Sequence, residues 1–210
     1  MNKKGTLQLS ILIPTIPERS RQFTLLYNEL MRQKTLFDTF HDTLGELEIV
    51  VNSSVKFLDG GLSIGKKREA LVQAANGEYL CFLDDDESIS PDYVETLMRL
   101  CYKDSDLCTF RAIVKMETFW TILDMSLVYP ENEQITPEST VRRPPWHVCP
   151  MKSKYAKMFD FKDINAAEDF EWMEKVLAMC VTESHTDRVI FQYNHKSESE
   201  SDKILNKGYA

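Results

Sequence analysis

The sequence predicts an α/β fold in which a mainly parallel central sheet is flanked by helices. Two observations lead to this fold class. Short apolar runs of strand-like composition alternate with segments whose apolar residues recur at helical spacing, a pattern typical of successive strand–helix units. In addition, a chain of 210 residues is long enough to bury the substantial core that such a fold requires.

The first half of the chain contains the predicted strand–helix pairs. In each pair, a short apolar run precedes a segment in which apolar side chains recur every three or four residues. Because strands joined through helices usually pair in parallel, these segments predict the parallel core of the sheet. The pairs are 7–14 with 18–34, 46–51 with 66–76, and 78–83 with 91–101.

The second half of the chain has a different pattern. Extended segments are expected at 107–115 and 119–128. The stretch 129–145 is polar and rich in proline, which favours a mobile or binding loop. A helix is predicted at 167–180 and a further strand at 188–193.

Composition limits the classes of function. A net charge of −8 argues against a surface that broadly attracts nucleic acid or anionic lipid. The N-terminal apolar run is too short for a signal peptide or a membrane span, so a cytoplasmic location is expected. The five cysteines contain no CxxC pair, which predicts buried thiols rather than a disulfide framework or a thiolate zinc site.

Acidic residues follow the third predicted strand, where Asp84, Asp85 and Asp86 are consecutive. Adjacent carboxylates repel one another, so this sequence favours a cation beside them. Ligands of parallel sheets bind at the carboxyl ends of the strands, and Mg²⁺ or Mn²⁺ often bridges a carboxylate to phosphate oxygens. We therefore expect a site for a nucleotide and a divalent cation at this edge. Its other expected residues are Pro14, Thr15, Glu18, Arg19, Asn52 and Arg68.

Four segments match a known family in their order along the chain. They are SILIPTIPER, IGKKREALVQAANGEYLCFLDDD, CPMKSKYAKMFDFKDINAAEDFEW and a histidine in the terminal segment. Through these segments, which span most of residues 9–195, the chain resembles the family 2 glycosyltransferases of the GT-A fold. The resemblance implies a Rossmann-like domain that transfers a sugar from a nucleotide-diphosphate donor, with a UDP-sugar favoured. It also implies inversion at the sugar and a hydroxyl acceptor, with a glycan or a small molecule favoured.

The resemblance implies roles for individual residues. Asp86 and His195 would hold Mn²⁺ or Mg²⁺, whose charge offsets the charge that grows on the leaving diphosphate. Asp169, together with its neighbour Glu168, would be the catalytic group that takes the proton of the acceptor hydroxyl. The expected contacts to the nucleotide-sugar come from Pro14, Thr15, Glu18, Arg19, Asn52, Lys66, Arg68, Asp84 and Asp85.

The same resemblance implies how the chain is divided. One domain is expected over residues 1–195, with a nucleotide-binding half at about 1–103, an acceptor-binding half at about 104–195 and a flexible tail at 196–210. Two positions depart from the family pattern. Glu69 follows Arg68, where members often have an asparagine. Asn52 stands where members often have an aspartate that binds the uracil base, so the identity of the base is open.

Three alternatives remain open from the sequence. The acceptor could be a hydroxymethylated pyrimidine in DNA, with the basic stretch 142–162 as its groove. A nucleotidyltransferase would also use a metal at a strand end, although PTIPERS lacks the glycine- and lysine-rich loop expected after its first strand. A binding module without turnover is the third alternative. His147, which lies beside Trp146, is assigned to the acceptor wall or the core.

Overall fold

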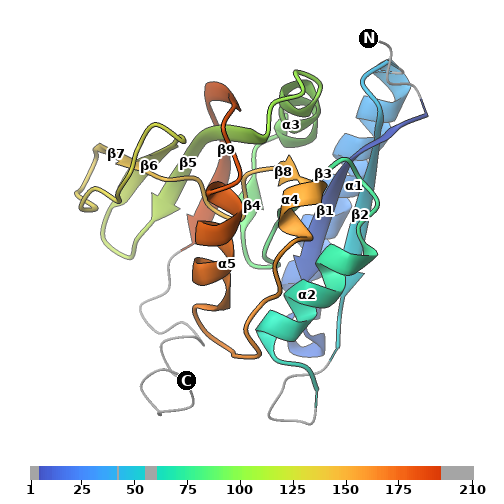
Figure 1. Cartoon of the computed structure of the whole chain (residues 1–210), viewed down its shortest axis with the longest axis horizontal. Helices are drawn as coiled ribbons and strands as arrows, with labels where there is room; N and C mark the ends of the chain where they lie inside the picture. The colour runs from blue at the N-terminus through green and yellow to red at the C-terminus, as the bar shows by residue number, and fades with distance from the viewer. Residues whose placement is uncertain (1–4, 42, 55–60, 195–210) are drawn as a thin grey trace.

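A computed structural model of the chain describes residues 5–41, 43–54 and 61–194. Its centre is one sheet with the strand order β2-β1-β3-β8-β5-β6-β7, to which β9 adds by pairing with β5 and β4 by pairing with β9 (Figure 1). The strands are β1 (Leu7–Pro14), β2 (Glu46–Asn52), β3 (Tyr79–Phe82), β4 (Ser88–Ile89), β5 (Leu107–Lys115), β6 (Trp120–Met125), β7 (Thr140–Arg143), β8 (Met151–Lys152) and β9 (Glu183–Asn194). The helices are η1 (Pro17–Arg19), α1 (Ser20–Phe40), α2 (Ile64–Ala74), α3 (Tyr93–Cys101), α4 (Ser153–Ala156) and α5 (Glu168–Leu177).

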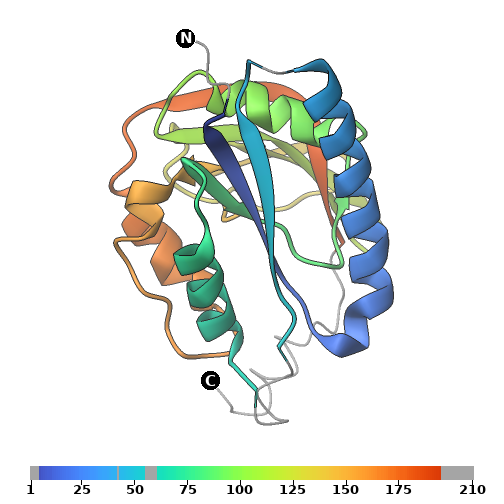
Figure 2. The same cartoon turned by 90° about the vertical axis from the view of Figure 1, so that its right-hand side faces the viewer.

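The core of the sheet is parallel. β1 pairs in parallel with β2 on one side and with β3 on the other. Ile11, Leu12 and Ile13 of β1 are fully buried although successive side chains of a strand face opposite ways, so both faces of the sheet must be covered. Figure 2 shows this covering, with α1 on one side of β1 and β2 and α2 on the other. The predicted α/β class with a parallel core is confirmed.

The far half of the sheet is mixed. β8 runs antiparallel to both β3 and β5, and β6 runs antiparallel to β5. β9 returns parallel to β5, and β7 lies parallel to β6. These pairings join the strands of the second half to the parallel core in one sheet.

Several element ends differ from the sequence-based expectation. α1 continues to Phe40, beyond the predicted end at residue 34. β9 begins at Glu183 rather than at residue 188, because it pairs along the whole length of β5. The polar stretch 129–145 contains β7, a strand that its composition does not reveal.

Other expectations concern the surface and the chain ends. Four of the five cysteines are buried and the fifth is partly exposed, and all are free thiols. In the part of the chain that the structure describes, no helix combines the length and the apolar character needed to cross a membrane. His195 and the tail 196–210 lie outside the described residues, and the division into two halves stays a prediction.

Candidate active site

The three aspartates that follow β3 point toward different partners. Asp84 accepts hydrogen bonds from Arg68 at 3.0 and 3.3 Å. Asp85 accepts one from Arg19 at 2.9 Å, and a carboxylate oxygen of Asp86 lies 3.5 Å from the same guanidinium. Two arginines of the chain therefore relieve much of the repulsion between these neighbouring carboxylates.

Asp85 fixes the turn to the end of β1. Its side chain is almost fully buried, and its second oxygen accepts a hydrogen bond of 2.6 Å from the hydroxyl of Thr15. Burial raises the pKa of Asp85, while the bonds from Thr15 and Arg19 act in the opposite direction. Thr15 and Arg19 were predicted to contact the donor, and in this structure both hold the turn.

Arg68 of α2 connects the turn to α5. It is 5% exposed, and its Nε donates a hydrogen bond of 2.8 Å to Glu168 while its Nη2 binds Asp84. The guanidinium also lies 4.7 Å from the centre of the Phe82 ring. Its third nitrogen, Nη1, is buried without a hydrogen-bond partner among the described residues. A buried cation with an unused donor next to carboxylates is typical of a binding site.

The start of α2 packs directly on the segment that precedes α5. A side chain at Gly65 would place its Cβ 1.9 Å from the carbonyl oxygen of Lys162, so only glycine allows this approach. The Gly65 amide donates to the carbonyl of Ile164 at 3.1 Å. α5 then begins after Ala167, which has a left-handed φ of 57°. Strained positions of this kind often occur at functional sites, and this one precedes the Glu168–Asp169 pair.

His147 lies between the turn and α5. It is 4% exposed, with Nε2 3.7 Å from Asp84 and Nδ1 2.7 Å from Asp169. Burial and the charge of Arg68 favour the neutral imidazole, but the two carboxylates outweigh them and raise the pKa of His147 above its ordinary value. Burial also opposes ionisation of Asp169, yet His147 and Arg68 hold its pKa well below the usual value. Asp169 is therefore an ionised carboxylate.

A lysine joins the ends of β1 and β2. Lys67, which is 3% exposed, donates to the backbone carbonyls of Thr15 and Ser54. The side-chain oxygen of Asn52 accepts a hydrogen bond of 3.1 Å from the Ser54 amide, and Pro14 pairs with Asn52 in the sheet. These contacts set the shape of the sheet edge where a nucleotide is expected.

A groove of about 690 Å³ opens beside Asp169. It runs between α5, the segment after β6 and the connection from β7 to β8, and its lining is mostly apolar. Its charged residues are Asp169, Glu131, Glu174 and Arg143, so acids outnumber bases. Arg143 stacks on the Trp146 ring at 4.6 Å. The apolar and aromatic lining includes Tyr129, Trp146, Phe170, Leu177 and Val181.

Several basic residues of the stretch 142–162 are engaged by other groups. Arg142 lies 3.7 Å from Glu133, and Lys152 contacts Glu78 at 2.5 Å. Cations that are paired with acids are less available to phosphates. The remaining contacts of this kind join Lys152 to Asp104, Lys162 to Glu171, and Lys157 to the carbonyl of Ala75.

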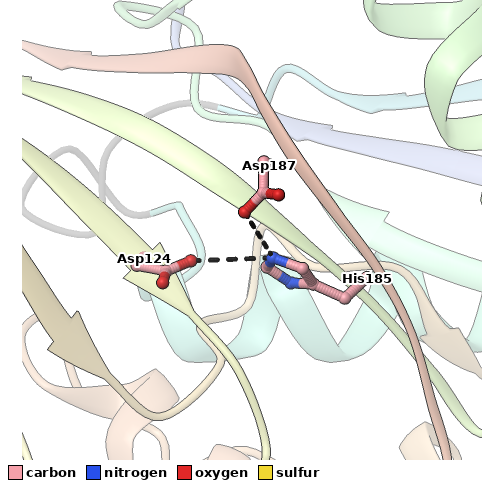
Figure 3. A group of neighbouring side chains, drawn as sticks. All are labelled: Asp124, His185 and Asp187. Carbon is pink, nitrogen blue, oxygen red and sulfur yellow. Dashed lines mark ion pairs between the residues drawn. The ribbon is translucent and has the colours of Figure 1, made fainter.

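A second group with metal-ligand character lies on β6 and β9. Asp124, His185 and Asp187 are close enough together to hold a metal ion (Figure 3). His185 Nε2 lies 3.7 Å from Asp124 and 3.5 Å from Asp187. The guanidinium of Arg111 already contacts both carboxylates, at 3.3 and 2.7 Å. This group lies on the first part of β9, whereas Asn194 at the other end of that strand bonds the Asp86 carbonyl at 2.9 Å.

The structure brings most of the predicted site residues together. They form two sets of contacts that the chain joins between Asp84 and Asp85. One set is made up of Thr15, Arg19, Asp85 and Asp86. The other is made up of Arg68, Asp84, Glu168 and, through His147, Asp169. Glu18 is exposed, and Lys66 pairs with Glu69 at 2.9 Å on the surface of α2. The roles predicted for these residues stay predictions. The bridging position of His147 and the buried Lys67 were missed, since an isolated histidine or lysine carries no sequence signal of its partners.

The donor set at the turn partly fits a divalent cation. Asp86 supplies the carboxylate oxygen that Mg²⁺ and Mn²⁺ prefer, and its side chain remains 18% exposed. The second predicted ligand, His195, is outside the described residues. The Asp84 side chain is more exposed, at 29%, but it is bound by Arg68.

Comparisons with known proteins agree with this geometry. Residues 25–167, more than half of the chain, match the family model described as glycosyl transferase family 2. The matched span ends just before Glu168 and Asp169. EpsH of Bacillus subtilis (strain 168), which is named as a glycosyltransferase, is 28% identical over 71 residues, which cover 34% of this chain and 21% of EpsH.

Solved structures of S. aureus TarS share the fold. The TarS 1-349 structure in complex with UDP-GlcNAc has a TM-score of 0.62 and 15% identity over 93% of this chain. The complex with UDP has a TM-score of 0.61 and 15% identity over 90% of this chain. The chain spans about 60% of the length of these TarS structures and a smaller part of EpsH. By the match of its sequence to the family model, the chain belongs to glycosyl transferase family 2.

Proposed function

We propose that this chain transfers a sugar from a UDP-sugar to an uncharged hydroxyl acceptor, with inversion at the sugar carbon. One observation carries the proposal. The carboxylate of Asp169 lines the groove and is linked through His147 to Asp84, next to the expected metal ligand. The proposed donor site and the proposed proton acceptor would thus lie next to each other at one edge of the sheet, as a displacement reaction requires.

The donor is expected at the ends of β1, β2 and β3. Arg68 with its unused Nη1, the Asn52 amide and Asp84 supply polar contacts for the nucleoside and its diphosphate. Asp86 would hold a divalent cation, which when bound neutralises charge on the diphosphate. TarS has been solved with UDP-GlcNAc and with UDP, which favours uridine in this chain as well.

The acceptor hydroxyl would lie in the groove beside Asp169. Its oxygen attacks the anomeric carbon as the bond from that carbon to the diphosphate oxygen breaks, and its proton passes to Asp169. Because Asp169 is held ionised, it is ready to accept a hydrogen bond from the hydroxyl. The groove is mostly apolar and carries more acids than bases, which favours an uncharged acceptor over DNA.

The proposal is tested by release of UDP. The purified chain is incubated with UDP-GlcNAc, UDP-glucose or UDP-galactose and p-nitrophenyl glycosides, with and without Mn²⁺. We expect metal-dependent UDP release with one of these donors, strongly reduced in Asp86→Asn. Asp38→Asn is the matched control, because Asp38 is an exposed residue of α1 paired with Lys34. UDP binding without release from any donor would instead indicate a binding module.

A further inference from the structure

His147 contacts two carboxylates that come from separate parts of the fold. Asp84 belongs to the turn after β3, and Asp169 belongs to the first turn of α5. The imidazole places Nε2 at 3.7 Å from the first carboxylate and Nδ1 at 2.7 Å from the second. Both ring nitrogens therefore face acids, which is the environment of an imidazole that carries protons on both.

The position of His147 is fixed by its surroundings. Its carbonyl accepts a hydrogen bond of 2.9 Å from the amide of Phe82, which holds its backbone against β3. Its ring meets the edges of the Phe82 and Trp146 rings, with centroids 6.0 and 5.3 Å away. A buried side chain that is packed in this way can move little, so it also restricts the positions of the side chains that it contacts.

Asp169 depends on this histidine for its orientation. Among the described residues, its ion pair is with His147, whereas Arg68 binds Glu168 and Asp84 instead. The short contact is poorly aligned for a linear hydrogen bond, so Nδ1 has no well-formed bond in this state. Catalytic hydrogen bonds are often poorly aligned without substrate and tighten in the complex.

We propose that His147 is a positioning residue that holds one oxygen of Asp169 and leaves the other oxygen directed to the groove, while its second nitrogen ties this carboxylate to the donor-side Asp84. This role rests on the proposed function, since it concerns the group that takes the acceptor proton. The groups facing His147 are Arg68 from α2, Asp84 from the turn and Asp169 from α5.

Two substitutions separate the two contacts. His147→Asn keeps an N–H donor at the position of Nδ1, toward Asp169, and loses the donor toward Asp84. His147→Gln keeps a donor at the position of Nε2 and loses the one toward Asp169. For donor turnover by the full chain, we expect His147→Gln to lower kcat by about 10-fold to 100-fold, the range for one lost hydrogen bond to a charged group, with little change in the donor KM. We expect His147→Asn to lower kcat less and to raise the donor KM.

The matched control is His185→Gln, since His185 also lies between two aspartates but is absent from the groove. It should keep the kcat and KM of the wild type. Equal kcat losses in His147→Asn and His147→Gln, or no loss in either, would overturn the positioning role. In that case, turnover by the wild type would still support the proposed function. Absence of wild-type turnover overturns both.

A second readout does not depend on the donor. In NMR spectra of the chain with ¹⁵N-labelled histidine, one imidazole should stay protonated on both nitrogens above the ordinary pKa of about 6.5. Asp169→Asn should shift the titration of that imidazole to lower pH. If no assigned histidine changes its titration in Asp169→Asn, the contact between His147 and Asp169 is contradicted, and with it the positioning role.

Discussion

Among the described residues, two groups combine a histidine with two aspartates, and they differ in which parts of the fold the histidine connects. In the bridging group, Asp84, His147 and Asp169, the imidazole is buried between the turn after β3 and α5. In the peripheral group, Asp124, His185 and Asp187, the side chains come from β6 and β9, the two strands that pair with β5.

The cations of the two groups also differ. Arg111 contacts both aspartates of the peripheral group, so its charge offsets part of theirs whatever the state of His185. In the bridging group, Arg68 contacts Asp84 and Glu168, and Asp169 is left to His147. The same side-chain types thus form a surface ion-pair cluster in one place and orient a groove-lining carboxylate in the other.

The largest expected difference between the groups concerns turnover. Asp169→Asn should lower sugar transfer by about 10²-fold to 10⁴-fold, the usual contribution of a positioned general base, while donor binding persists. Asp187→Asn in the peripheral group should leave transfer unchanged. UDP release and calorimetric binding of the donor measure the two effects. Equal rates for the two variants would remove the functional distinction between the groups.

Stability should separate the two arginines next. Arg68→Met leaves the buried Glu168 and the partly buried Asp84 without this cation and should cost about 3–5 kcal/mol. Arg111→Met breaks partly exposed ion pairs, which are screened by solvent, and should cost about 0–1 kcal/mol. Urea denaturation of both variants measures these losses of folding free energy. Similar losses would show that the ion pairs of Arg68 contribute no more to stability than the more exposed ion pairs of Arg111.

A smaller effect should appear in the pH dependence of stability. The pKa of His147 is raised in the folded chain, so its ion pairs add stability below the unfolded pKa of about 6.5. This contribution is lost as the pH rises through the folded pKa. The stability difference between wild type and His147→Gln should therefore shrink as the pH rises from about 6.5 through the folded pKa. A difference that grows over this range would mean that the imidazole is neutral in the folded state.

The smallest expected effect concerns the groove wall. Phe170 lines the groove and is 62% exposed, so an apolar part of the acceptor can cover it. Phe170→Ala should raise the KM for p-nitrophenyl glycosides by about 2-fold to 10-fold, the range of one aromatic contact. Phe40→Ala, which removes an exposed aromatic ring at the end of α1, is the control. An unchanged KM would place the acceptor elsewhere.

Much of the fold was predictable from the sequence because its signals are local. The apolar runs of β1, β2 and β3 and the helical spacing in α2 and α5 follow from short stretches of sequence. The length of β9 was not predictable, since it depends on pairing with β5. β7 was not predictable either, because its polar residues adopt a strand conformation through pairing with β6.

The candidate site was predictable only where residues form a recognisable motif. The aspartates after β3, Arg68 and Asp169 were found in this way. The partner of Asp85 was not found, because Arg19 is 66 positions away. Lys67 was passed over in favour of Lys66, since a lysine is rarely placed on the buried face of a helix without a fixed partner. Contacts between distant positions become visible only when the fold brings them together.

The most direct test of the central claim is the anomeric configuration of the product. A base at Asp169 takes the acceptor proton on the face of the sugar opposite the leaving diphosphate, so the displacement must invert the anomeric carbon. For an α-linked UDP-sugar, the ¹H NMR coupling of the newly formed glycoside should report a β linkage. An α-linked product would contradict the role assigned to Asp169.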